Sequence, residues 1–328
     1  MSLIAAVADY TASFAIESDS ALETARQCLI DALARGFEAL RDPECACLMG
    51  PLVPGALMPG GARIPGTSLE LDPAQAAFCL GVMLCRLPSG EPCPDLPPAC
   101  AASLGAVLAT ADYVARRATM EGKSPPTVRD VLAAIVKALE IQDVPAPGNG
   151  SQRAWIATLR LARLAATAVA TAQLGGTPGQ IVSALSYASL DGGMLVEADE
   201  PSDIARRDWA TAEAISHAVR HACYAMASAR SSRPTAIDLE TVDLAGRLLS
   251  ARTPTRGQPF GTEVIERLAG RRSPQDVTRL TVRFQSAVNR YFPLRQAERI
   301  KALFAAPGRL AGLPVNELLA TLVTNGAR

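Results

Sequence analysis

The chain has 328 residues, and its 32 Lys and Arg residues balance 32 Asp and Glu residues, so the formal net charge is zero. This length is enough for one large hydrophobic core with a smaller domain beside it. A neutral chain has no strong electrostatic attraction for nucleic acid, and no run of about 18 apolar residues is present to span a membrane. We therefore expect neither a nucleic-acid nor a membrane partner.

The first clear helix signal lies near the N-terminus. Ser20 and Glu23 have the spacing of a capping box, and apolar side chains then recur at helical spacing to about Leu40. Similar patterns predict further helices. They cover residues 73–87, 99–120, 127–141, 151–174, 177–190, 204–229, 236–250, 296–304 and 314–323. The stretch 154–172 is apolar on nearly every side, which fits a core helix or an interface helix, and we favour the core.

A loop of tight turns separates the first two predicted helices. It contains the motifs PG at residues 54–55, PGG at 59–61 and PG at 65–66. Proline fixes φ and glycine tolerates a positive φ, so such pairs favour turns over a helix or a regular strand. Asp72 as N-cap and Pro73 at the first helical position then begin the next helix.

The last third of the chain differs in character from the rest. After a break near residue 232, Leu280, Val282 and Phe284 alternate with polar residues. A period of two predicts a half-buried strand over residues 278–284.

The histidines and cysteines give no metal motif. His217 and His221 share a predicted helix face with Glu213, but a metal would need a further ligand. We expect a solvated or interface face with pairs four residues apart. Cys45 and Cys47 are too close together for a zinc knuckle, and no histidine lies near them.

A series of short motifs runs in order along the first two thirds of the chain. It comprises CLIDAL at residues 28–33, ALRDPEC at 39–45, GPLVPG at 50–55, GARIPGT at 61–67, LDP at 71–73, LATAD at 108–112, RDVL at 129–132, LEIQ at 139–142, LGGT at 174–177 and WA at 209–210. Their order and spacing resemble the MmgE/PrpD family, most closely its 2-methylcitrate dehydratase branch.

This resemblance implies a helical domain followed by a smaller α+β domain. Members of the dehydratase branch are longer than this chain, and the missing length lies mostly after residue 229. We therefore expect a mostly α fold, with an all-helical MmgE/PrpD-like domain over residues 1–232 and a reduced α+β domain over residues 233–328.

The resemblance also implies a small polycarboxylate substrate, which loses a proton together with a hydroxyl group or carbon dioxide, without a metal. Such chemistry needs an acid/base and cations that stabilise the developing charge. Where the family has an Asp-rich motif, this chain has PSGE at residues 88–91. It has ACA at 99–101 in place of His-Pro-Ser, and Arg206 and Arg207 where the family has a lysine.

Four residues remain as candidates for the family's chemistry. Glu91 and Asp95 are the candidate acid/base residues, and Arg207 is a third catalytic candidate. Arg206 and Arg207 are the candidate substrate-binding residues, because arginine binds carboxylates but keeps its proton at ordinary pH. The resemblance implies no cofactor.

Two functions follow from these substitutions. The first is a divergent 2-methylcitrate-dehydratase-like protein that keeps a lyase scaffold but has lost most of the catalytic motif. The alternative is an active lyase or isomerase of a small polycarboxylate that uses Arg206 and Arg207 with Glu91 or Asp95. The resemblance implies a homodimer through the helical domain. The start of the chain lacks the basic segment of a signal peptide, so we expect a cytoplasmic protein.

Overall fold

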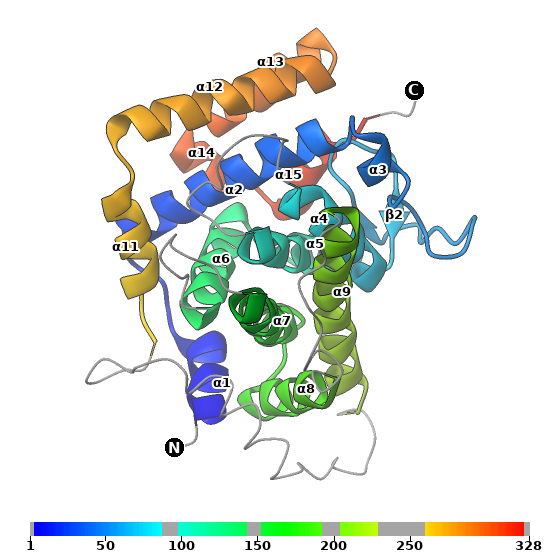
Figure 1. Cartoon of the computed structure of the whole chain (residues 1–328), viewed down its shortest axis with the longest axis vertical. Coiled ribbons are helices and arrows are strands. Elements are labelled where there is room, and N and C mark those ends of the chain that lie inside the picture. The colour runs from blue at the N-terminus through cyan, green and yellow to red at the C-terminus, as the bar shows by residue number, and fades with distance from the viewer. Residues whose placement is uncertain (1–2, 87–97, 143–151, 192–203, 229–259, 325–328) are drawn as a thin grey trace.

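A computed structural model describes residues 3–86, 98–142, 152–191, 204–228 and 260–324 (Figure 1). Nearly all regular structure in these ranges is helical, which confirms the predicted mostly α fold with a small amount of sheet. The first part holds helices α1 (Leu3–Ser13), α2 (Asp19–Ala39), α3 (Pro43–Ala46), α4 (Pro73–Cys85), α5 (Pro98–Met120), α6 (Val128–Gln142), α7 (Gln152–Gln173), α8 (Pro178–Asp191) and α9 (Ile204–Ser228). No helix among the described residues is both long and apolar enough to cross a membrane.

Helix α7 lies at the centre of the first part, with α5, α6, α8 and α9 around it (Figure 1). Leu159, Ala165 and Val169 of this helix are buried. The described side chains of the apolar segment 154–172 therefore supply core, as favoured from its sequence.

Helix α4 is pressed closely between α5 and α9. It carries no charged side chain, and all its residues except Gln75 are buried. A Cβ atom on Gly81 would lie 2.9 Å from the Cα of Ala212 in α9, and one on Gly105 of α5 would lie 2.9 Å from the Gly81 nitrogen. Only glycine permits so close an approach, so these contacts fix the position of α4 against α9.

The loop between α3 and α4 turns as predicted. Gly55, Gly60 and Gly66 all have positive φ angles of 80° to 82°. The exclusion of strands was wrong, because β1 (Ala62–Arg63) pairs antiparallel with β2 (Glu70–Leu71). The carboxylate of Asp72 caps α4 by accepting from two backbone N–H groups at 3.0 and 3.1 Å.

The last described residues form α11 (Glu263–Arg271), α12 (Pro274–Tyr291), α13 (Leu294–Phe304), α14 (Pro307–Ala311) and α15 (Val315–Thr321). The strand predicted over residues 278–284 was wrong, because this stretch lies inside α12. Ser273 and Asp276 form a capping box at its start, and the buried side chains Phe284, Ala287 and Val288 recur at helical spacing. The helix predicted over residues 236–250 lies outside the described residues.

These last helices pack on the first part of the chain. Helices α11 and α12 cover α2, and α15 lies against α5. The Gly66 N–H donates to the Leu322 carbonyl at 2.6 Å, and the Val128 N–H donates to the Leu313 carbonyl at 2.8 Å. Segments more than 180 residues apart in sequence are thus joined backbone to backbone.

Candidate functional site

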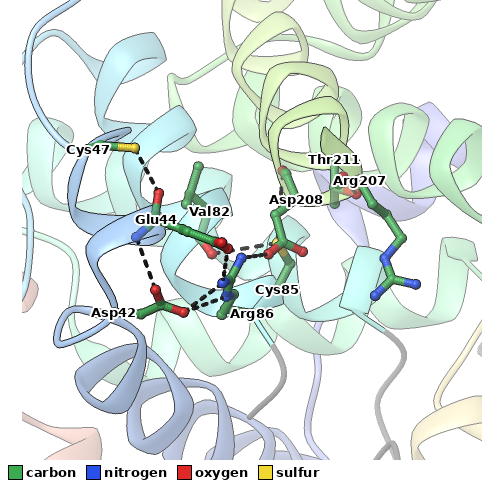
Figure 2. A network of polar contacts seen from close by, with 9 residues as sticks. All are labelled: Asp42, Glu44, Cys47, Val82, Cys85, Arg86, Arg207, Asp208 and Thr211. Atoms are coloured by element: carbon green, nitrogen blue, oxygen red, sulfur yellow. Dashed lines mark hydrogen bonds and ion pairs between the residues drawn. The ribbon is translucent and has the colours of Figure 1, made fainter. Parts of the chain in front are cut away.

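Arg86 joins three segments at the end of α4. It is the first charged residue after Asp72, and it follows a helix made of uncharged residues. Its Nη1 lies 2.9 Å from Asp208 Oδ2, and its Nη2 lies 2.6 Å from both Asp42 Oδ2 and Glu44 Oε2 (Figure 2). The start of α3, the end of α4 and the start of α9 are thus held by one guanidinium group.

The contacts of this cluster differ in burial. The side chain of Arg86 is 12% exposed and that of Asp208 is 5% exposed, whereas Glu44 is 62% exposed. Burial favours the neutral form of Arg86, but hydrogen bonds to Glu44, Asp208 and Asp42 outweigh it and raise the pKa of the guanidinium group. Burial raises the pKa of the Asp208 carboxyl group, and Arg86 offsets only part of that rise.

Asp42 behaves differently from Asp208. Burial again favours its neutral form, but the backbone N–H of Glu44 and the side chain of Arg86 outweigh burial and hold its pKa below the ordinary value. Asp42 is also the N-cap of α3. It therefore has a local structural role as well as its place in the cluster.

Cys85 lies against the inner side of the cluster. Its Sγ donates to Asp208 Oδ1 at 3.6 Å. Burial, followed by the neighbouring Asp208 carboxylate, raises the pKa of this thiol well above its ordinary value. A buried thiol that stays protonated is a weak nucleophile, so Cys85 is a packing residue with a weak hydrogen bond.

Arg206 and Arg207 lie in the first turn of α9, next to Asp208. Arg206 is exposed and Arg207 is half-buried, and no acidic residue lies in this first turn. Figure 2 shows the Arg207 guanidinium directed away from the Arg86 cluster. Helix N-termini carry partial positive charge, and the two arginines add positive charge at this end.

The structure describes two of the four predicted site residues. Glu91 and Asp95 lie outside the described residues. Arg206 and Arg207 lie at the start of a helix, as the sequence predicted. The ion pair of Arg86 with Asp208 connects this helix to the end of α4.

The Arg86 cluster was missed in the sequence, although signals for it exist. A single arginine ends an uncharged apolar helix, and such a charge at the edge of the core needs a partner. The partners, however, come from residues 42, 44 and 208, which no sequence spacing relates to residue 86.

His217 has the predicted partner four residues away on its own helix. His217 Nε2 lies 3.0 Å from Glu213 Oε1, four residues earlier on α9, and His221 is buried. Within the described ranges, no three His, Cys, Asp or Glu side chains are grouped so as to hold a metal ion.

Comparison with known proteins identifies the family to which the chain is similar. The model of the MmgE/PrpD N-terminal domain matches residues 5–241. The 2-methylcitrate dehydratase of Salmonella typhimurium is 37% identical over 270 residues, which are 79% of this chain and 54% of that protein. The 2-methylcitrate dehydratase of Escherichia coli is 40% identical over 229 residues, 67% of this chain and 46% of that protein.

A third relative, the 2-methylcitrate dehydratase of Cupriavidus necator, is 37% identical over 272 residues, 80% of this chain and 54% of that protein. The chain thus spans about half the length of the curated relatives it matches. The matching domain model covers well over half of the chain. We conclude that the chain belongs to the MmgE/PrpD family.

Proposed function

We propose that this protein binds a small polycarboxylate where the end of α4 meets the start of α9, on a scaffold that has lost most of the dehydratase motif. The observation that carries the proposal is the Arg86–Asp208 ion pair. It holds the electropositive first turn of α9, with Arg206 and Arg207, beside the last residue of α4. A carboxylate bound there would be stabilised by charge-assisted hydrogen bonds from both arginines and by the partial positive charge of the helix end.

Several sequence positions support the loss of dehydration. By the family resemblance, PSGE at residues 88–91 and ACA at residues 99–101 stand where an Asp-rich and a His-Pro-Ser motif are expected. Proline and alanine transfer no proton, and arginine at the position of the family lysine is a poor general acid. The relatives are named as 2-methylcitrate dehydratases, so 2-methylcitrate and citrate are the first ligands to test.

The experiment follows 2-methylcitrate and citrate by NMR with the purified protein in excess. We expect line broadening of the tricarboxylate without its loss. Arg207→Ala should weaken this binding about tenfold or more, since it removes a charge-assisted contact. Arg290→Ala is the matched control, because Arg290 is an exposed arginine on α12. Equal binding by both variants would refute the site.

An active lyase is the second candidate. The short stretch of chain between Arg86 and Glu91 favours it. Glu91 comes five positions after Arg86, so their Cα atoms lie at most about 18 Å apart. Turnover of a tricarboxylate that Glu91→Gln and Arg207→Ala both abolish would establish this alternative. Asp95 comes nine positions after Arg86, so the length of chain between them restricts their distance little.

The homodimer and the cytoplasmic location also belong to this proposal. Among the described residues, Cys28, Cys45, Cys47, Cys79, Cys85 and Cys223 are free thiols. Free thiols fit a reducing compartment. Sedimentation velocity over a range of protein concentrations tests the dimer, and fractionation of cells tests the location.

A further inference from the structure

Arg35 in α2 is a charged side chain inside the core. The residue is only 1% exposed, and its side chain is one of the largest that the fold buries completely. Its Nη2 lies 2.8 Å from Asp31 Oδ2, one turn earlier on the same helix. Arginine is rarely buried to this extent, and a buried guanidinium group needs a partner for each of its N–H groups.

The hydrogen bonds of Arg35 are incomplete. Among the described residues, Nε, Nη1 and Nη2 of Arg35 find no acceptor in hydrogen-bonding geometry, and Asp31 Oδ2 finds no donor. The two groups attract each other as charges, but they are not aligned as donor and acceptor. A buried donor without an acceptor costs stability, and in a native protein such a group marks the place of a bound water molecule or ion.

The carboxylate of Asp31 also faces a second arginine. Arg283 of α12 has its Nη1 3.7 Å from Asp31 Oδ1 and its Nη2 3.0 Å from Glu38 Oε2. Asp31 therefore lies between two guanidinium groups, one from α2 and one from α12. It supplies Arg35 with only part of a counter-charge.

Two thiols lie near Arg35 and add no negative charge. The guanidinium group acts electrostatically on the thiols of Cys28 and Cys85, which are both buried. Burial raises the pKa of each thiol above its ordinary value. Both thiols are therefore protonated at neutral pH, and the positive charge of Arg35 stays incompletely balanced.

We propose that Arg35 binds a small inorganic anion of the size of chloride at the contact between α2 and α12. Such an ion would accept the N–H groups of Arg35 that lack an acceptor and would balance its charge. Asp31 would then be left to Arg283, so the bound ion would stabilise the packing of α12 on α2. The site does not depend on the polycarboxylate proposed for α9.

The packing around Arg35 limits the size of the ion. The neighbouring Gly36 lies so close to α4 that a Cβ there would be 2.5 Å from Met83 Cε. Phe37 is fully buried, and its ring meets that of Phe292 edge to face, with 4.9 Å between the ring centroids. Helices packed this closely exclude a tricarboxylate. The remaining alternative is water, which the experiments must distinguish from an anion.

The first test is urea unfolding between about 5 and about 500 mM chloride, with sodium gluconate holding the ionic strength constant. Once the site is mostly filled, the unfolding equilibrium constant should fall about tenfold for each tenfold rise in chloride, because unfolding releases the ion. Arg35→Met should remove this dependence. Arg26→Met is the matched control on α2, because Arg26 is bonded to Glu23 and to the Phe304 carbonyl and should keep the dependence.

The second test locates the ion in the wild type, so it decides the proposal even if Arg35→Met does not fold. Bromide replaces chloride in such sites and scatters X-rays anomalously. Crystals grown in bromide should show an anomalous peak within hydrogen-bonding distance of Arg35 Nε or Nη1. A water molecule or an empty space there, without a peak, would overturn the proposal. A chloride dependence that Arg35→Met retains would overturn it as well.

Discussion

Arg86 Nη1 lies 2.9 Å from Asp208 Oδ2, so the residue that follows α4 is paired with a residue near the start of α9. Both side chains are almost fully removed from water. Two ions leave water at a cost that is offset only while both remain paired. This pair therefore makes the junction of α4 and α9 sensitive to the loss of either partner.

Replacement of Arg86 by methionine should lower the free energy of unfolding by about 3 kcal/mol, because it leaves Asp208 buried without its main cation. Urea denaturation at neutral pH measures the change. Arg117→Met is the control, since Arg117 is 53% exposed in its pair with Glu121 and should lose less than about 1 kcal/mol. Equal losses of unfolding free energy for the two variants would show that the Arg86–Asp208 ion pair stabilises the fold no more than a surface ion pair does.

Gly66→Ala should destabilise the protein by more than about 2 kcal/mol. The φ of Gly66 is +82°, and a Cβ there would lie 2.5 Å from Leu40 Cδ1 and 2.9 Å from Tyr291 Cε1. Gly122→Ala is a matched control, because Gly122 has a φ of +68° and no atom within 4 Å of such a Cβ. Gly122→Ala should lower the free energy of unfolding by only about 1 kcal/mol. Thermal unfolding of both variants measures the difference. An equal loss for Gly66→Ala and Gly122→Ala would contradict the steric argument.

Alkaline pH should weaken the fold through buried thiols. Burial raises the pKa of Cys45 from 9.0 to about 12 and that of Cys79 to about 11. A thiol whose folded pKa is raised contributes stability that is complete below the unfolded pKa and is lost as the pH rises. Above pH 9, each such thiol should cost about 1.4 kcal/mol per pH unit.

Cys45→Ala supplies the measurement for this pH dependence. Denaturant unfolding of the wild type and the variant at a series of pH values between neutral and alkaline gives two curves. The difference between them should shrink as the pH rises, since the variant lacks one of the titrating groups. Parallel curves would mean that Cys45 ionises equally well in the folded and unfolded chains.

Thiol labelling should follow exposure. Cys47 is exposed and its Sγ donates to the Glu44 carbonyl at 3.0 Å, whereas Cys28 and Cys79 are buried. A maleimide under native conditions should modify Cys47 in minutes and the buried pair only on unfolding. Mass spectrometry of peptides separates these sites from the other cysteines. Fast modification of Cys28 would show that α2 opens readily.

Much of the helical fold was predictable because its signals are local. Asp72 and Pro73 mark the start of α4, and Thr127 with Asp130 marks the start of α6, where Thr127 N–H donates to Asp130 Oδ2 at 2.7 Å. Ser20 was the wrong cap for α2, since the side chain of Ser18 accepts from the Ala21 N–H instead. Two serines stood near one helix start, and the pattern did not distinguish them.

The errors in the last third have a similar cause. Leu280, Val282 and Phe284 alternate over only five residues, a length at which strand and helix periods overlap. The capping box at Ser273 and Asp276 was the overlooked signal. The division of the chain near residue 232 falls outside the described residues and stays a prediction.

The candidate site was predictable only in part. Arg206 and Arg207 were predicted because the family resemblance places a lysine just before Trp209, and their role as site residues stays a prediction. The Arg86 cluster depends on contacts between residues that lie 42 to 122 positions apart, and its ion pair with Asp208 exists only once α4 has packed on α9. That packing is set by Gly81 and Ala212, whose close approach no local pattern reports.

The bonds between the two ends of the chain have a consequence for its synthesis. Tyr10 Oη donates to the Gly261 carbonyl at 2.7 Å, and the Gly66 N–H donates to the Leu322 carbonyl at 2.6 Å, each across more than 250 residues. Contacts that close such long loops form late, and a ribosome delivers the first helices well before the last ones. The Gly66 N–H therefore reaches its acceptor, the Leu322 carbonyl, only after α15 has emerged from the ribosome.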